Sequence, residues 1–228
     1  MEDLTLKIVA RIRSDFPTKF GIPRQSGLVD SLTATVVFEP DFQNPDALRG
    51  LEDFTHIWLL WGFSEAFRDE WSPTVRPPRL GGNARMGVFA TRSPFRPNPL
   101  GLSCVRLISV EQHPTKGPLL HISGADLMDG TPIYDIKPYL LTTDCRPEAS
   151  PGFTAVHTDY TLSVDIPAEE ARKLPADKLE ALHDILAQDP RPAYHHDDSR
   201  KYGFPFAGYE VQFVVQENVA KVLKITKS

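Results

Sequence analysis

The chain has 228 residues, 41% of them hydrophobic, a net charge of −5 and two cysteines. This length and composition predict a buried core and exclude disorder for the bulk of the chain. Two cysteines are too few for a disulfide framework, and neither lies in a metal-ligand spacing. The acidic N-terminus is unlike a signal peptide, and the most apolar run, residues 57–63, is far shorter than the ~20 residues of a membrane-spanning helix. We therefore expect a cytoplasmic protein without a membrane partner.

In chain order, the first two thirds predict short strands. Residues 5–13 and 32–39 alternate apolar and polar side chains as half-buried strands do, and residues 56–63 are apolar on both faces, as in a central strand. Between them, a proline, an acid and a final glycine predict one short helix over residues 44–50. Further strands are predicted over residues 86–90, 103–110, 119–123, 133–137 and 160–165. This rhythm predicts a closed antiparallel β-barrel.

The last third predicts a separate small unit. Residues 141–157 show little periodicity, as in a loop or linker. Residues 175–188 carry leucines on one helical face, and residues 209–225 read as two strands around Glu217 and Asn218. The fold class is therefore mainly β, with a barrel domain over residues 1–165 and a small α+β domain over residues 166–228.

One segment concentrates positive charge. From Arg76 to Arg106 the chain holds six arginines and no acid or lysine, so this stretch carries +6 and the remainder −11. Prolines restrict the backbone of residues 75–103, and glycines allow it unusual dihedral angles and close approach to a ligand. The guanidinium groups of this segment are therefore expected to be preorganised for an anionic ligand. Alternatively, these arginines pair with acids elsewhere and the prolines only shape the rim of a barrel.

Two further segments carry candidate chemistry. Asp126, Asp129 and Asp135 surround a Gly-Thr-Pro turn; turn chemistry alone would explain Asp129, whereas a functional carboxylate could hold ribose hydroxyls, face a sulfonium cation or take a proton. His195 and His196 lie beside two aspartates, but no third-ligand spacing is present, so we expect a solvated loop and no metal site. Glycine fingerprints of Rossmann and P-loop enzymes are absent from the sequence.

Several strings together carry a specific resemblance. They are RPPRLGGNARMGVFATRSPFRPNPLGLS at residues 76–103, FGIPRQ at 20–25, LEDFTHIW at 51–58, and residues 126–139 and 189–194. From about Lys19 to the C-terminal strands the chain resembles the TsaA-like, or TrmO, family. The resemblance implies a non-Rossmann β-barrel methyltransferase that uses S-adenosylmethionine and acts as a homodimer. It further implies methylation of N6 in N6-threonylcarbamoyladenosine at position 37 of tRNA.

Carried over position by position, the resemblance implies a set of cofactor contacts: Pro23, Arg24, Gln25, Phe63, Ser64, Arg92, Leu102, Asp126, Leu127, Met128 and Asp129. Ser64 lies outside the matching strings, and residues 14–17 depart from the family pattern.

Methyl transfer to N6 releases a proton, and we expect Asp126 or Asp129 to accept it or to organise the cofactor. For the acceptor's carboxylate we expect a clamp by Arg96 or Arg85, with Arg191 as a further candidate. Phe95, Tyr134 or Tyr194 is expected to stack on the unpaired base, although each also suits packing.

The sequence is also compatible with two other hypotheses about function. One is a non-catalytic barrel that binds RNA through the same arginines. The other is a methyltransferase of the same fold with another RNA or a small molecule as acceptor. A binding module has no need for the carboxylates of residues 126–129, which favours the enzyme.

Overall fold

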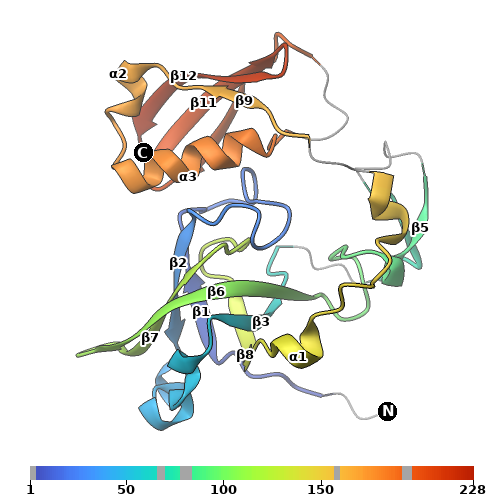
Figure 1. Cartoon of the computed structure of the whole chain (residues 1–228), viewed down its shortest axis with the longest axis vertical. Coiled ribbons are helices and arrows are strands. Elements are labelled where there is room, and N and C mark those ends of the chain that lie inside the picture. The colour runs from blue at the N-terminus through green and yellow to red at the C-terminus, as the bar shows by residue number, and fades with distance from the viewer. Residues whose placement is uncertain (1–3, 66–69, 78–83, 157–159, 192–196) are drawn as a thin grey trace.

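The chain forms a β-barrel and a smaller α+β unit (Figure 1). The structure, a computed structural model, describes residues 4–65, 70–77, 84–156, 160–191 and 197–228. Among these residues no helix is both long enough and apolar enough to cross a membrane.

Six strands close the barrel in the order β1-β2-β7-β6-β3-β8, and every neighbouring pair is antiparallel. They are β1 (Ala10–Arg13), β2 (Thr33–Phe38), β3 (His56–Gly62), β6 (Leu100–His113), β7 (Gly117–Ser123) and β8 (Pro132–Pro138). Alternate side chains of β3 are buried in the barrel core, namely Ile57, Leu59 and Trp61. The predicted closed antiparallel barrel is confirmed.

Some predicted elements differ. Strand β1 starts only at Ala10, and the helix predicted over residues 44–50 is a single 3-10 turn, Pro45–Leu48, between the similar turns Pro40–Phe42 and Leu51–Asp53. Gly50 explains the short turn, because its φ of 84° breaks the helical path. The strand predicted over residues 86–90 is only β5 (Met86–Gly87), which pairs with β4 (Thr74–Val75) outside the barrel.

The second unit is a four-stranded sheet in the order β10-β11-β12-β9. Its strands are β9 (Ser163–Asp165), β10 (Tyr202–Phe206), β11 (Tyr209–Gln216) and β12 (Val219–Lys227); its helices are α2 (Ala168–Ala171) and α3 (Ala176–Ala187). The predicted turn between two strands is confirmed, with Glu217 and Asn218 at φ 48° and 64°. Such angles match the right-handed twist of a tight hairpin.

The expected domain boundary after residue 165 falls too late. Strand β9 pairs in parallel with β12, so it belongs to the second unit and not to the barrel. Sequence pattern missed this because a three-residue strand carries no usable periodicity. The linker before it contains a short helix, α1 (Leu141–Asp144), and a 3-10 turn, Gly152–Val156.

The segment between β1 and β2 ties the two units together. Phe16, Val29 and Leu32 are buried in the hydrophobic core of the second unit, beside the strands and α3. Gly21 has φ 94°, and a Cβ there would lie 2.6 Å from the ring of Phe204, so only glycine fits. This packing fixes the path of residues 23–25, which lead to the candidate site.

Candidate active site

A cavity of about 600 Å³ opens where several strand ends and loops meet. The loop after β1 contributes Pro23, Arg24 and Gln25 to its lining. Phe63 and Ser64 follow β3, and Leu102 lies at the start of β6. Arg92 lies in the arginine-rich loop, residues 88–99 between β5 and β6, and Asp126 and Met128 follow β7. Residues far apart in the sequence thus converge on one volume, and its size is that of a typical small-molecule site.

Asp126 is held by a chain of hydrogen bonds that starts in the barrel core. The indole Nε1 of Trp61 donates to Ser103 Oγ over 2.9 Å, and Ser103 Oγ donates to Asp126 Oδ1 over 2.6 Å. Ser103 is only 1% exposed, so its hydroxyl cannot turn to solvent. The backbone amide of Ser26 also donates to this carboxylate. Asp126 is therefore rigidly placed at the cavity.

Burial raises the pKa of Asp126 above that of an ordinary aspartate. The hydroxyl of Ser103, backbone amides and the charge of Arg92 act in the opposite direction and offset part of the effect. A carboxylate that is poorly solvated in its ionised form binds a proton more readily. Asp126 therefore has the environment of a general base.

Arg92 places a positive charge beside this carboxylate. Its Nη1 donates to the side-chain carbonyl Oε1 of Gln25, and both residues line the cavity. The pair joins the arginine-rich loop to the loop after β1. The cavity therefore presents an acid, a cation and an amide on one side and the apolar surfaces of Phe63 and Leu102 as further walls. Such a mixture suits a small molecule with a flat ring, hydroxyls and a charged group.

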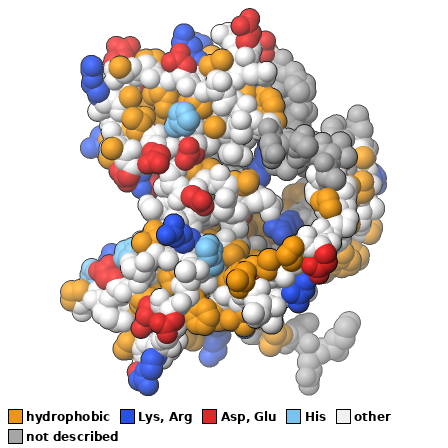
Figure 2. Space-filling model, viewed as in Figure 1, with side chains coloured by type: hydrophobic (Ala, Val, Ile, Leu, Met, Phe, Trp, Pro, Cys, Tyr) orange, Lys and Arg blue, Asp and Glu red, His pale blue; other side chains and the backbone are white. Residues whose placement is uncertain are grey.

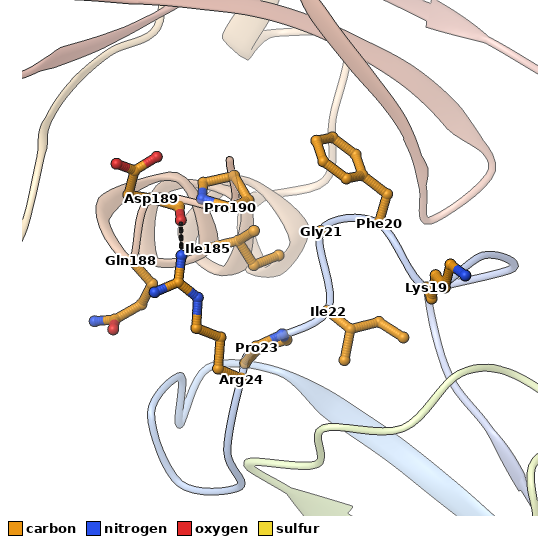
Figure 3. A pocket seen from close by; sticks show the side chains of 10 residues that line it. All are labelled: Lys19, Phe20, Gly21, Ile22, Pro23, Arg24, Ile185, Gln188, Asp189 and Pro190. Carbon is orange, nitrogen blue, oxygen red and sulfur yellow. Dashed lines mark hydrogen bonds between the residues drawn. The ribbon is translucent and has the colours of Figure 1, made fainter. Parts of the chain in front are cut away.

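Arg24 connects the cavity to the second unit. Figure 3 shows its side chain reaching the end of α3, where Nη2 donates to the carbonyl of Asp189 over 3.1 Å, and it also donates to the carbonyl of Arg191 over 3.2 Å. Carbonyls at the end of a helix attract a cation. Ile22 and Ile185 also line the small pocket drawn there, of about 100 Å³. The second unit thus borders the candidate site.

Arg191 does not line the cavity. Its Nε donates to Asp189 Oδ1 over 2.8 Å and its Nη2 donates to Asp189 Oδ2 over 3.0 Å, a two-point ion pair with little exposure. The clamp proposed for it would require this pair to open. Tyr194 lies outside the described residues. Arg85 is exposed and lies outside the cavity lining.

Arg96 lines the cavity, but its guanidinium faces its own loop. Nε donates to the carbonyl of Ser93 over 3.0 Å, and Nη2 donates to the carbonyls of Val88, over 3.1 Å, and Thr91. Three backbone acceptors on one fork fix the curvature of the arginine-rich loop. Arg96 thus shapes the wall, and the sequence reading of it as a carboxylate clamp finds no support in these contacts.

We predict that replacing Arg96 by alanine lowers the free energy of unfolding by about 2 kcal/mol, because three carbonyls lose a charged donor. Replacing it by lysine should recover little of this loss, since an ammonium group cannot match the planar fork. Urea denaturation of both variants measures the effect. If the lysine variant were as stable as the unmodified protein, the hydrogen bonds of Arg96 to the three carbonyls could not be what stabilises this loop.

Asp129 and Leu127 are not among the cavity-lining residues. The carboxylate of Asp129 accepts from the amide of Ser14 over 3.1 Å and from Arg13 Nη1 over 3.4 Å, on the side of β1. The side chain of Leu127 is 1% exposed and packs in the barrel core. Of the two candidate bases, only Asp126 faces the cavity.

Sequence reasoning missed Ser103 and Trp61, although both support Asp126. The signal was available in β6, where Ser103 alternates with the buried Val105 and Leu107 and so occupies an inward position. A serine facing a barrel core requires a hydrogen-bond partner. Within the described segments, no group of three or more His, Cys, Asp or Glu side chains is arranged to hold a metal ion.

The chain matches two family models. The tRNA-methyltransferase O N-terminal domain covers residues 11–145, and the TrmO C-terminal domain covers residues 156–228.

Known relatives and structures agree with these matches. The Escherichia coli K12 protein named tRNA (adenine(37)-N6)-methyltransferase is 41% identical over 92% of this chain and 97% of its own length. A Pseudomonas aeruginosa protein named putative S-adenosylmethionine-dependent methyltransferase RcsF is 41% identical over 86% of this chain and 85% of its own. A crystal structure of TrmO from P. aeruginosa superposes with a TM-score of 0.80 at 33% identity, covering 100% of this chain and 99% of that one.

Proposed function

Because this chain belongs to the tRNA-methyltransferase O family, we propose that it transfers a methyl group from S-adenosylmethionine to N6 of adenosine 37 in tRNA. The observation that carries the proposal is the buried carboxylate of Asp126, fixed by Ser103 at a cavity built from the strings that resemble the family. A general base at a small-molecule cavity is what this reaction requires.

The residues of the cavity fit the cofactor. Phe63 and Leu102 offer apolar surface to an adenine ring, and the side chains of Gln25 and Asp126 offer polar groups to ribose and amino-acid moieties. The ionised Asp126 favours a positive charge nearby. When bound, S-adenosylmethionine supplies a methyl group on a positively charged sulfur. Arg92 is placed to meet the cofactor's carboxylate or an RNA phosphate.

The chain's own contribution to the reaction is positioning and proton transfer. N6 of adenine shares its lone pair with the purine ring, so it gains nucleophilic character only as its proton leaves. Asp126 accepts that proton as N6 forms its bond to the methyl carbon; the carbon–sulfur bond of the donor would break in the same step, so that S-adenosylhomocysteine leaves as a neutral thioether and N6 ends neutral. The hydrogen bonds from Ser103 and Ser26 keep the carboxylate in place before and after the transfer.

The finer proposals concern the acceptor and the assembly. We propose that the acceptor is N6-threonylcarbamoyladenosine, whose carboxylate would be met by Arg191 once its pair with Asp189 opens. We also propose that the enzyme is a cytoplasmic homodimer. These proposals rest on the family resemblance.

Mass spectrometry of position 37 tests the function. The purified protein, S-adenosylmethionine and tRNA carrying threonylcarbamoyladenosine should give a product heavier by one methyl group. The same tRNA with unmodified adenosine 37 is the matched control and should not react. Reaction of both tRNAs would remove the threonylcarbamoyl requirement. Reaction of neither, with no heat of binding for S-adenosylmethionine, would instead indicate an RNA-binding barrel.

A further inference from the structure

A two-stranded ribbon stands outside the barrel beside the candidate site. Strands β4 and β5 pair antiparallel, with Thr74 opposite Gly87 and Val75 opposite Met86. The amide of Val88 donates to the carbonyl of Pro73 over 3.0 Å and extends the pairing by one position. Figure 1 shows β5 on a segment that projects from the barrel strands. Figure 2 shows the molecule hollowed between this side and the barrel, with basic side chains visible in the hollow.

Two aromatic rings are exposed at one end of this ribbon. Trp71 is 50% exposed and Phe89 is 75% exposed, and their ring centroids lie 6.2 Å apart with an interplanar angle of 30°. Phe89 is rigidly anchored, because its neighbour Val88 is buried and the carbonyl of Val88 accepts from Arg96. Exposed rings on a fixed backbone leave apolar faces in water without any gain for the fold.

Two arginines lie at the other end of the ribbon. Arg76 follows Val75 and Arg85 precedes Met86, so the register places them opposite each other, and both are exposed. Within the described segments, neither has an acidic side chain within ion-pair distance. Glu70 precedes Trp71 in the sequence and so lies toward the aromatic end of the ribbon, away from the two arginines. As far as the structure describes the chain, the arginine end thus carries positive charge without an acidic partner.

We propose that this ribbon binds single-stranded RNA next to the methylated nucleotide, with a base stacked on Trp71 and Phe89 and phosphates bound by Arg76 and Arg85. This inference rests on the proposed function. Every base offers a flat face to an aromatic ring, and a guanidinium fork matches a phosphate.

The dimensions and location of the ribbon agree with this ligand. The six residues from Trp71 to Arg76 would span about 16 Å in an extended chain, which accommodates more than one nucleotide. Arg96 joins the ribbon to the cavity, since it lines the cavity and holds Val88. A nucleotide on the ribbon would therefore be close to one whose base enters the cavity. A symmetric contact between the ribbons of two copies is disfavoured, because it would bring the arginines of both ribbons together.

The double variant Trp71→Ala, Phe89→Ala tests the stacking surface. We expect tRNA binding, measured by fluorescence anisotropy, to weaken by about 10-fold or more, and kcat/KM to fall in parallel. The Kd for S-adenosylmethionine should not change. Trp71→Phe keeps a ring and should lose much less tRNA affinity than the double alanine variant, and the quenching of tryptophan fluorescence by tRNA should become smaller. Ile108→Ala, an equally exposed apolar residue on β6, is the control and should bind normally.

The variants Arg76→Gln and Arg85→Gln test the phosphate contacts. Each should make the dependence of log Kd on log salt concentration shallower by about 0.7, the value for one phosphate contact with a single strand. An unchanged slope in both would overturn this part of the proposal.

Three outcomes separate this proposal from the proposed function. Unmodified protein that does not methylate tRNA rejects the function itself. Unmodified protein that methylates tRNA, with a double alanine variant that binds and reacts equally well, rejects only the ribbon. A double variant whose mass in light scattering falls to that of a smaller assembly identifies the aromatic pair as a contact between copies, which also overturns the proposal.

Discussion

Replacing Asp126 by asparagine is expected to lower the rate of methyl transfer by about 10²- to 10⁴-fold and to leave the fold intact. Asparagine has the same shape, and its carbonyl oxygen can still accept from Ser103 Oγ, but it cannot take a proton. Single-turnover methylation of tRNA at saturating cofactor measures this step.

The rate of the unmodified enzyme should also depend on pH. Because burial raises the pKa of Asp126, the rate should increase as the pH rises through that raised value, where the carboxylate ionises.

The same substitution should make the protein more stable near neutral pH. A folded-state pKa above the unfolded value means that the folded protein binds this proton more tightly. The stability gained is fully present below the ordinary pKa of aspartate and is lost as pH rises through the folded pKa of Asp126. Asparagine removes this loss, so we expect thermal unfolding at pH 7 to shift upward by about 2–4 °C. A lower unfolding temperature for Asp126→Asn would mean that Ser103, Ser26 and Arg92 stabilise the ionised carboxylate of Asp126 by more than its burial costs.

Asp129→Asn is the matched control for the assignment of the base. Its carboxylate faces Ser14 and Arg13 and does not line the cavity, so the methylation rate should change little. If Asp129→Asn were inactive and Asp126→Asn active, the two roles would have to be exchanged.

The second large effect is expected for Gly101→Ala. Gly101 lies opposite Trp61 in the pairing of β6 with β3, and a Cβ at this position would come within 2.2 Å of the indole ring. Trp61 is 9% exposed and is fixed by its hydrogen bond to Ser103, so the ring cannot move without breaking the chain to Asp126. We expect a loss of about 3 kcal/mol or more in the free energy of unfolding. Methylation should fall by about 100-fold, because Asp126 would be misplaced.

Gly87→Ala is the matched control, because it makes the same glycine-to-alanine change at a position with free space. A Cβ on Gly87 meets nothing within 4 Å, and its φ of −57° suits any residue, so its unfolding free energy should stay close to that of the unmodified protein. Urea denaturation of the two variants side by side gives the comparison. If Gly101→Ala were as stable as Gly87→Ala, the close packing of Trp61 on β6 would be disproved.

The sequence predicts the barrel well because β2 alternates apolar and polar side chains and β3 is a short apolar run, both typical of strands. Strands β2 and β7 appear within two residues of their predicted bounds, and the turn at Glu217 and Asn218 is found as expected. The pattern fails where tertiary contacts decide the outcome. The pairing of β9 with β12 and the burial of Phe16 and Leu32 in the second unit depend on partners far away in the sequence.

The candidate site is predictable in membership but not in roles. The strings of the family resemblance lead to Asp126, Arg92 and the loop of residues 23–25, and the fold brings them together. Which way each side chain points is decided by local hydrogen bonds. Arg96 binds its own loop and Asp129 binds Ser14, and no sequence spacing encodes those choices.

The position of the bound cofactor tests the assignment of the active site. In a crystal structure with S-adenosylhomocysteine, the demethylated product, we predict electron density in the cavity between Asp126 and Leu102, with the sulfur facing the side where an RNA base can enter. Density in another hollow, such as the one between β1 and α3 lined by Arg13 and Lys178, would contradict the assignment of the active site.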